Sequence, residues 1–166
     1  MALQDILEIT SSKKKIGVSE ERIAAIKPYL RQYIAFWREY PDLFVDFMQT
    51  GGNPDKQLTF KLYFYQRVFL RVGMRFKYVY AVYPRAFSKS FLSVMIQMIR
   101  CILYPGAHIF SAAGGKEQSA QILSEKIEDI CTKIPAFRRE INWNRGEGTV
   151  MGKDHCRFVF KNGSQL

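Results

Sequence analysis

The chain has 166 residues and a formal net charge of +10, and 48% of its residues are hydrophobic, including 13 Phe and 9 Tyr. This length suits one domain, or one domain with an appendage, and the apolar and aromatic content excludes an intrinsically disordered chain. The excess of Lys and Arg favours a polyanionic partner, although a basic surface without special function would carry the same charge.

Cysteine usage and hydropathy exclude further classes. Cys101, Cys131 and Cys156 are widely spaced and form no C-x-x-C pair, so we expect no zinc site. We expect the three cysteines to be reduced thiols. The first residues lack the charged and then apolar pattern of a signal peptide. The most apolar stretch, 91–104, is too short to cross a bilayer, so we expect no membrane role.

Residues 1–57 are predicted to form a helical N-terminal extension. An apolar helix candidate at 3–9 is followed by a polar linker, and Ser19 with the acids after it is typical of a helix start. Apolar residues within 30–37 recur at helical spacing, which more often indicates core packing than a ligand site. A glycine-rich turn at 51–54 ends this region.

Residues 58–166 are predicted to form the N-terminal part of an α/β domain that is incomplete at its C-terminus. A helix is expected over 63–75. β-type runs at 78–83 and 108–113 are each followed by a predicted helix, the first over 88–103 and the second ending near 133. Strands that alternate with helices over short loops are typical of a parallel sheet flanked by helices, as in P-loop NTPases.

The turn from Tyr83 to Ser90 has the outline of a phosphate-binding loop. A helix N-terminus offers unpaired N–H groups, Lys89 can reach the β- and γ-phosphates, and the hydroxyl that follows can hold Mg²⁺. The usual pattern, G-x-x-x-x-G-K-[ST], has glycine where this chain has Tyr83 and Ser88. The alternative is an ordinary strand–loop–helix crossover.

Hydrolysis requires a carboxylate that this loop does not supply. P-loop NTPases place an aspartate at the end of a second apolar strand, and no acid after Lys89 follows such a run. The acids at 125–129 lie in a predicted helix and are interpreted as a solvated face. The catalytic residue is therefore unknown, and we expect weak nucleotide binding and negligible hydrolysis from this chain alone.

The last residues predict a hairpin. Residues 156–160 alternate like a strand, and Asn162-Gly163 is a strong turn signal. Only three residues remain for the returning strand. The sequence therefore predicts that another segment completes this sheet, or that the chain is a piece of a larger protein.

Together these motifs resemble the large terminase subunit of tailed bacteriophages over about 58–166. In that family an N-terminal ATPase drives double-stranded DNA into a procapsid and a C-terminal nuclease cuts it. The resemblance implies the ATP-binding part of a viral DNA-packaging motor in the host cell cytoplasm, with the acidic strand and the nuclease beyond Leu166. It is carried by Tyr65-Gln66-Arg67, residues 83–92, Tyr104-Pro105-Gly106, residues 115–120 and residues 160–164.

The resemblance also implies ligands, partners and residue roles. ATP and Mg²⁺ would be bound, the partners would be DNA, the portal and the small terminase subunit, and the full-length protein would form a homo-oligomer. Gln66 would read the adenine edge with Tyr65 nearby, although a solvated helical Gln is the plain alternative. Ser90 would also ligate Mg²⁺. The implied nucleotide-binding residues are Tyr65, Gln66, Arg85, Ala86, Phe87, Ser88, Lys89, Ser90 and Phe91.

Within this set, Arg85 and Lys89 would contact the phosphates. Residues 115–120 would couple the nucleotide state to DNA, though a simple strand-to-helix turn is nearly as good an interpretation. Arg138 and Arg139 could meet DNA phosphates, but a solvated charge pair is the better default. Two other functions stay open: a truncated or split non-catalytic interaction module, and a helicase-like ATPase fragment.

Overall fold

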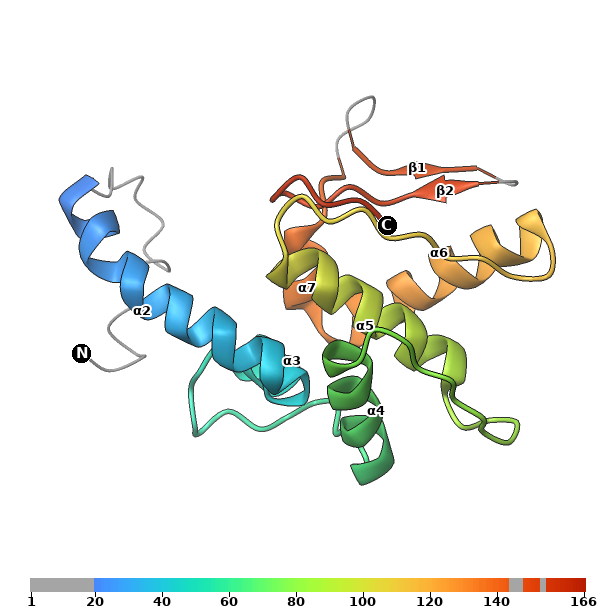
Figure 1. Ribbon diagram of the computed structural model, residues 1–166, viewed down its shortest axis with the longest axis horizontal. Coiled ribbons are helices and arrows are strands. Elements are labelled where there is room, and N and C mark those ends of the chain that lie inside the picture. Colours follow the sequence, from blue (N-terminus) through green and yellow to red (C-terminus); the bar gives the residue numbers. More distant parts are fainter. Residues whose placement is uncertain (1–19, 144–147, 153–154) are drawn as a thin grey trace.

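The computed structural model describes residues 20–143, 148–152 and 155–166 (Figure 1). The predicted helix at 3–9 and the helix start at Ser19 lie outside these residues. Over the described part the chain is mostly helical, with a two-stranded antiparallel sheet. The helices are α2 Glu20–Glu39, α3 Pro41–Thr50, α4 Phe64–Arg75, α5 Lys89–Leu103, α6 Lys116–Lys133 and α7 Pro135–Glu140, and the strands are β1 Val150–Met151 and β2 Cys156–Arg157.

The predicted parallel sheet flanked by helices, of the P-loop NTPase type, is wrong for the described residues. Segment 78–83 is extended, and its side chains alternate as predicted: Tyr78, Tyr80 and Val82 are 83%, 93% and 76% exposed. Val79 and Ala81 face a groove beside α5. No backbone hydrogen bond joins this segment to another described segment. Alternation alone does not make a strand, because a ladder also needs a neighbouring strand.

The second predicted strand, 108–113, pairs only at its beginning. His108 forms an isolated parallel bridge with Gln165, and Ile109 N–H donates to the Gln165 carbonyl at 2.9 Å. Beyond this bridge Phe110 is 90% exposed. The short contact replaces the parallel strand pair that the sequence pattern predicted.

The predicted C-terminal hairpin turn is confirmed. Phe160 N–H donates to the Ser164 carbonyl at 2.8 Å, and Gly163 has a φ of 84°, which favours glycine. Leu166 pairs back with Phe158 at 2.8 and 3.0 Å. This small β-layer lies across one side of the helices (Figure 1).

Helix α5 lies at the centre of the core. Its buried side chains are spread around the helix, as expected for a helix covered on several sides. It packs against α4 and α6, and Asn162 Nδ2 donates to the carbonyls of Cys101 and Ile102 near its C-terminal end at 2.8 and 3.0 Å. The fully buried side chains of this helix are those of Leu92, Met95, Met98, Ile99 and Cys101.

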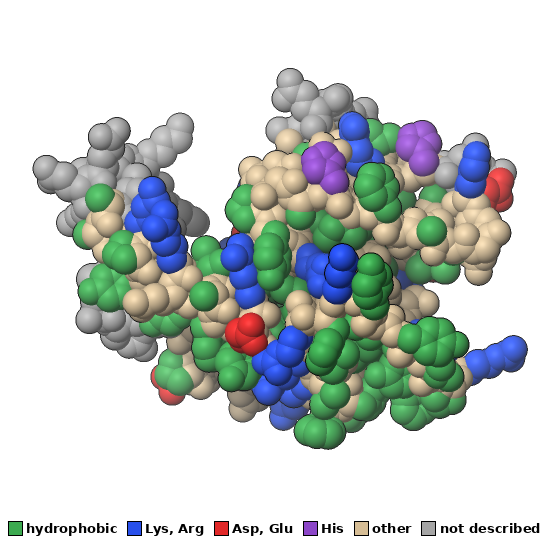
Figure 2. Space-filling view, viewed as in Figure 1, with side chains coloured by type: hydrophobic (Ala, Val, Ile, Leu, Met, Phe, Trp, Pro, Cys, Tyr) green, Lys and Arg blue, Asp and Glu red, His purple; other side chains and the backbone are tan. Residues whose placement is uncertain are grey.

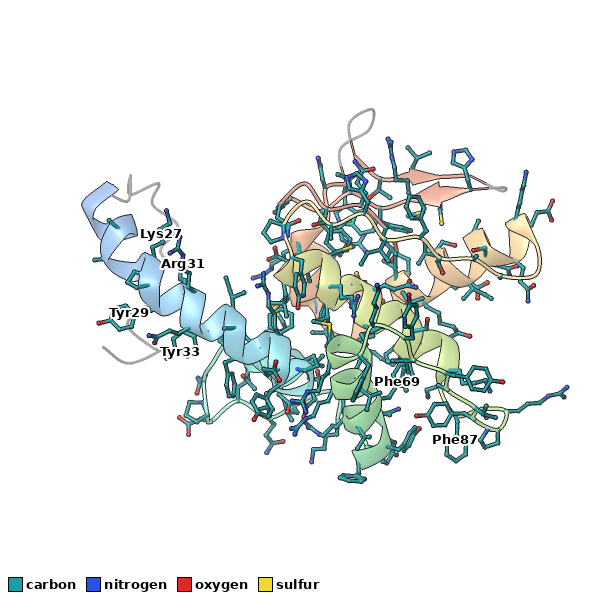
Figure 3. All side chains as sticks on the ribbon, viewed as in Figure 1. Lys27, Tyr29, Arg31, Tyr33, Phe69 and Phe87 are labelled. Atoms are coloured by element: carbon teal, nitrogen blue, oxygen red, sulfur yellow. The ribbon has the colours of Figure 1, made fainter. Side chains whose placement is uncertain are left out.

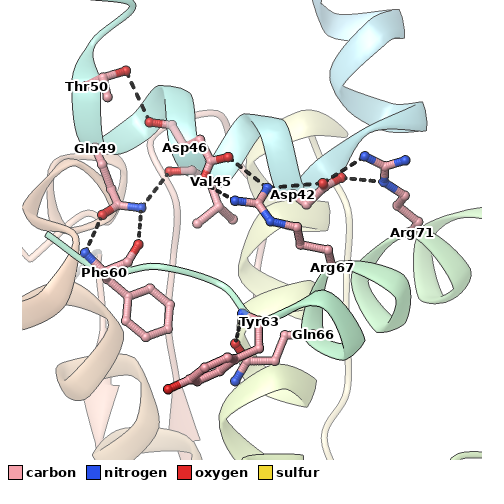
Figure 4. Close-up of polar contacts among 10 residues, drawn as sticks. All are labelled: Asp42, Val45, Asp46, Gln49, Thr50, Phe60, Tyr63, Gln66, Arg67 and Arg71. Atoms are coloured by element: carbon pink, nitrogen blue, oxygen red, sulfur yellow. Dashed lines mark hydrogen bonds and ion pairs between the residues drawn. The ribbon is translucent and has the colours of Figure 1, made fainter. Parts of the chain in front are cut away.

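An ion-pair network joins α3 to α4 (Figure 4). Asp42, whose side chain is 1% exposed, accepts from Arg71 Nε at 2.7 Å and from Arg67 at 3.2 Å, and Arg67 also pairs with Asp46 at 2.8 Å. Burial alone would raise the pKa of Asp42, but the hydrogen bonds from Arg71 and Arg67 outweigh it and lower the pKa below 3.8. The network fixes the position of α4 and so of Gln66.

No helix in the described part of the chain has the length and apolar character needed to cross a membrane.

Candidate anion-binding site

A pocket of about 460 Å³ lies where the start of α4, the loop before α5, the start of α5 and one face of α6 meet. We call it the α5 pocket. Its walls include Gln66 and residues 86–91 from the predicted site, together with Phe60 and Tyr63. α6 contributes three further residues, Lys126, Asp129 and Lys133.

The structure therefore brings together every predicted nucleotide-binding residue except Tyr65 and Arg85. Tyr65 does not line the pocket. Its ring packs against the rings of Tyr83 and Phe87 at centroid distances of 6.2 and 5.3 Å. Arg85 is exposed and is not among the residues that line the pocket.

The loop before α5 has two non-glycine residues in the left-handed region. Ala86 has a φ of 67° and Ser88 a φ of 53°. A side chain in this region costs about 1–2 kcal/mol, and glycine avoids that cost. The glycine missing from the motif at position 88 is thus replaced by a serine that adopts the backbone shape glycine would provide.

Ser88 leaves the start of α5 open. It is the N-cap residue but makes no side-chain capping hydrogen bond. The first helical bond runs from Leu92 N–H to the Ser88 carbonyl at 2.9 Å. The N–H groups of Lys89, Ser90 and Phe91 therefore have no acceptor within the helix, and all three residues line the pocket. Together with the helix dipole they form a partial positive charge at this wall.

The Lys89 ammonium closes the loop onto itself. Its Nζ donates to the carbonyls of Tyr83 at 3.0 Å and Pro84 at 2.7 Å, and the side chain stays exposed. An ammonium has three N–H donors, so one remains for a phosphate oxygen.

Gln66 is 4% exposed and makes hydrogen bonds through both ends of its amide, of which Figure 4 shows the one to Tyr63. Its Oε1 accepts from Tyr63 N–H at 2.9 Å, and its Nε2 donates to the Tyr65 hydroxyl at 3.3 Å. The alternative of a solvated helical Gln is wrong. One lone pair of Oε1 and one Nε2 hydrogen are used in these bonds, so the second lone pair and the second hydrogen are left for a ligand.

The pocket is electropositive. Lys89, Lys126 and Lys133 line it, and Asp129 is the carboxylate among its lining residues. Asp129 pairs with Lys133 one turn away. The balance of charge favours an anion over a cation in this site.

The described residues offer little for a protein-held metal ion. Ser90 lines the α5 pocket as predicted, but no group of three or more His, Cys, Asp or Glu lies together in the part of the chain that the structure describes. The donors present fit a phosphate chain well, and they fit Mg²⁺ only as Ser90 plus the oxygens of a bound phosphate.

Sequence reasoning missed the α6 wall. Lys126, Asp129 and Lys133 follow one another at positions i, i+3 and i+7, which places them on one helix face. The sequence pattern predicts that Asp129 belongs to a solvated acidic face, but the structure places it in the lining of the pocket. The spacing of these three residues indicates that they share one helix face. Because α6 lies far along the chain from the loop before α5, the sequence does not show that this face lines the same pocket.

The other predicted contacts have local roles. Arg138 pairs with Glu128 at 2.9 Å and lies over the Trp143 ring at 4.5 Å. Residues 115–120 form the N-cap and first turn of α6, and Gly115, Lys116, Ser119 and Ala120 line a separate pocket with Cys156.

Comparison with protein-family models, with curated proteins and with solved structures finds no match for this chain. The resemblance to large terminase subunits therefore rests on the sequence motifs alone, and the site is interpreted from its own geometry.

Proposed function

We propose that the α5 pocket binds the phosphate chain of ATP, and that the chain is the ATP-binding part of a DNA-packaging motor of the terminase large-subunit kind. One observation carries the binding proposal: a single pocket gathers the open N-terminus of α5, the loop at 86–88, Gln66 and three lysines. The motor function rests on the motif resemblance.

The pocket residues divide the work of binding. The free N–H groups of Lys89, Ser90 and Phe91 would donate to phosphate oxygens at the positive end of α5. The Lys89 ammonium would donate its third N–H to a phosphate oxygen while it holds the loop carbonyls. Ser90 would hold Mg²⁺ that arrives with the nucleotide, and this ion would screen the phosphate charge.

Gln66 supports adenine recognition because its amide keeps both a donor and an acceptor. One lone pair of Oε1 accepts from Tyr63 N–H, which leaves the second lone pair and the second Nε2 hydrogen for the base edge. Tyr65 would act indirectly, because its hydroxyl accepts from Nε2 and fixes the amide plane.

Basic side chains support a role near DNA. Figure 2 shows Lys and Arg spread over one face with few Asp and Glu among them. Figure 3 shows Lys27 and Arg31 on one side of α2 and Tyr29 and Tyr33 on the other. Two cations one turn apart on a projecting helix suit phosphate contacts. Double-stranded DNA, a portal, a small terminase subunit, assembly as a homo-oligomer and the host cytoplasm belong to this proposal.

A second function, a non-catalytic interaction module, is favoured by one observation. The extended segment 78–83 carries exposed Tyr78, Tyr80 and Val82, and no backbone–backbone hydrogen bond joins it to another described segment. Apolar side chains on an unpaired extended segment are typical of a protein–protein contact.

Calorimetric titration with ATP tests the binding proposal. Lys89→Ala should lower the affinity about 10- to 150-fold, because a hydrogen bond to a charged group contributes about 1.5–3 kcal/mol. Lys161→Ala, at an exposed lysine of the hairpin turn, is the matched control and should bind like wild type. Equal affinity of wild type and Lys89→Ala would remove the proposal, and the interaction module would then be preferred.

A further inference from the structure

We infer that α6 is a second phosphate-binding element and that Lys126 is its principal contact. The natural ligand rests on the proposed function, but the anion preference of α6 rests on separate observations. The α5 pocket has two facing walls: the start of α5 with its loop, and the α6 face that carries Lys126, Asp129 and Lys133.

Lys126 differs from the other cations of the pocket. Lys89 donates to two loop carbonyls, and Lys133 pairs with Asp129. Lys126 is half-buried and has no hydrogen bond or ion pair with any residue that the structure describes. An ammonium that lines the pocket and has no protein acceptor is available to bind an anion.

The nearby acids of α6 are engaged elsewhere. Glu125 accepts from Gln121 at 2.7 Å, and Glu128 pairs with Arg138 at 2.9 Å. The pocket thus keeps an uncompensated positive charge at Lys126 on one wall and free N–H groups on the other. Donors on two facing walls suit a polyanion with several phosphates better than a single phosphate.

A phosphate chain held between the walls would tie α6 to α5. These two helices already pack against each other, and the pocket opens between the start of α5 and the C-terminal half of α6. Binding by Lys126 therefore predicts that affinity rises with the number of phosphates. The increase in affinity with each added phosphate should depend on Lys126 of α6.

The experiment titrates inorganic tripolyphosphate and ATP, each by calorimetry, into wild type and variants. Lys126→Gln should weaken binding of both ligands tenfold or more, and Lys126→Arg should retain most of the affinity because the charge remains. Lys116→Gln, on the same helix but outside the pocket, is the control and should leave both affinities unchanged. Without ligand, Lys126→Gln should melt close to the wild-type temperature, whereas the loss of a structural lysine would lower it.

The outcomes separate this inference from the proposed function. If Lys126→Gln binds both ligands as tightly as wild type, the inference is overturned. If in that case Lys89→Ala still loses ATP binding, the proposed function is supported without the inference. Binding of tripolyphosphate but not ATP, sensitive to Lys126, would support the inference and overturn the function. Absence of binding to either ligand would overturn both.

Discussion

The side-chain carbonyl of Gln66 accepts a hydrogen bond from the backbone N–H of Tyr63 at 2.9 Å, which closes the N-terminus of α4. A residue expected to read a base is therefore also part of the helix cap. Gln66→Ala should lower the free energy of unfolding by about 1 kcal/mol, because the N-terminal N–H loses its acceptor. Urea denaturation measures this loss.

Gln66→Glu separates the two roles of this residue. A glutamate keeps an oxygen for Tyr63 N–H but loses the amide donor. The ratio of ATP to GTP affinity, measured by calorimetry, should fall toward one in Gln66→Glu and in Gln66→Ala. A ratio that is unchanged in both variants would assign Gln66 to the helix cap alone.

Asp42 is the buried anion that holds α3 against α4. Asp42→Asn should destabilise the fold by about 2–3 kcal/mol, less than for a fully buried pair, because Arg67 and Arg71 keep partial contact with water. Asp55→Asn, at an exposed aspartate, is the matched control and should change stability little.

The contribution of Asp42 should depend on pH in one direction. Its pKa is lowered in the folded chain, so its stabilising effect is fully present above about pH 4 and is lost as the pH falls through the folded pKa. The stability difference between wild type and Asp42→Asn should therefore shrink below pH 4 in urea titrations. A constant difference from pH 7 down to pH 2 would contradict this.

Ser88 occupies a backbone position that favours glycine. Ser88→Gly should raise the melting temperature, because relief of about 1–2 kcal/mol of local strain outweighs the added flexibility of the unfolded chain. Ser93→Gly, in the body of α5, is the control and should destabilise by about 0.5 kcal/mol. Equal destabilisation by both variants would show that residue 88 is not strained.

Gln97 carries a buried side-chain oxygen with no hydrogen-bond partner among the described residues. An unsatisfied buried acceptor costs about 1–3 kcal/mol. Gln97→Met should therefore stabilise the chain by about 1 kcal/mol in thermal or urea unfolding. Gln118→Met, at an exposed position of α6, should change stability by less than about 0.5 kcal/mol. Destabilisation by Gln97→Met would mean that this oxygen has a partner in solution.

The parts predicted correctly from sequence are those that local signals determine. The helices over 63–75 and 88–103 were expected within a residue of α4 and α5, and Asn162-Gly163 marks a real turn. Apolar periodicity and glycine act over a few residues, so they can be read from one segment at a time.

The parts that failed depend on distant partners. Segment 78–83 has strand-like alternation, but a sheet also needs a neighbour, and no local pattern states whether one is present. The α6 wall of the pocket was missed for the same reason, since Lys126 lies far along the chain from the loop. The two arginines that pair with Asp42 of α3 likewise come from another helix, α4, so no local pattern around Asp42 predicts them.

The central claim is that the start of α5 binds a nucleotide. An NMR titration of isotopically labelled chain with ATP locates binding residue by residue. We predict that the largest shifts fall on the backbone amides of residues 86–91 and on α6 around Lys126, with tripolyphosphate reproducing the α6 changes. Shifts confined to other elements such as α2, or no saturable shifts at millimolar ATP, would contradict the account.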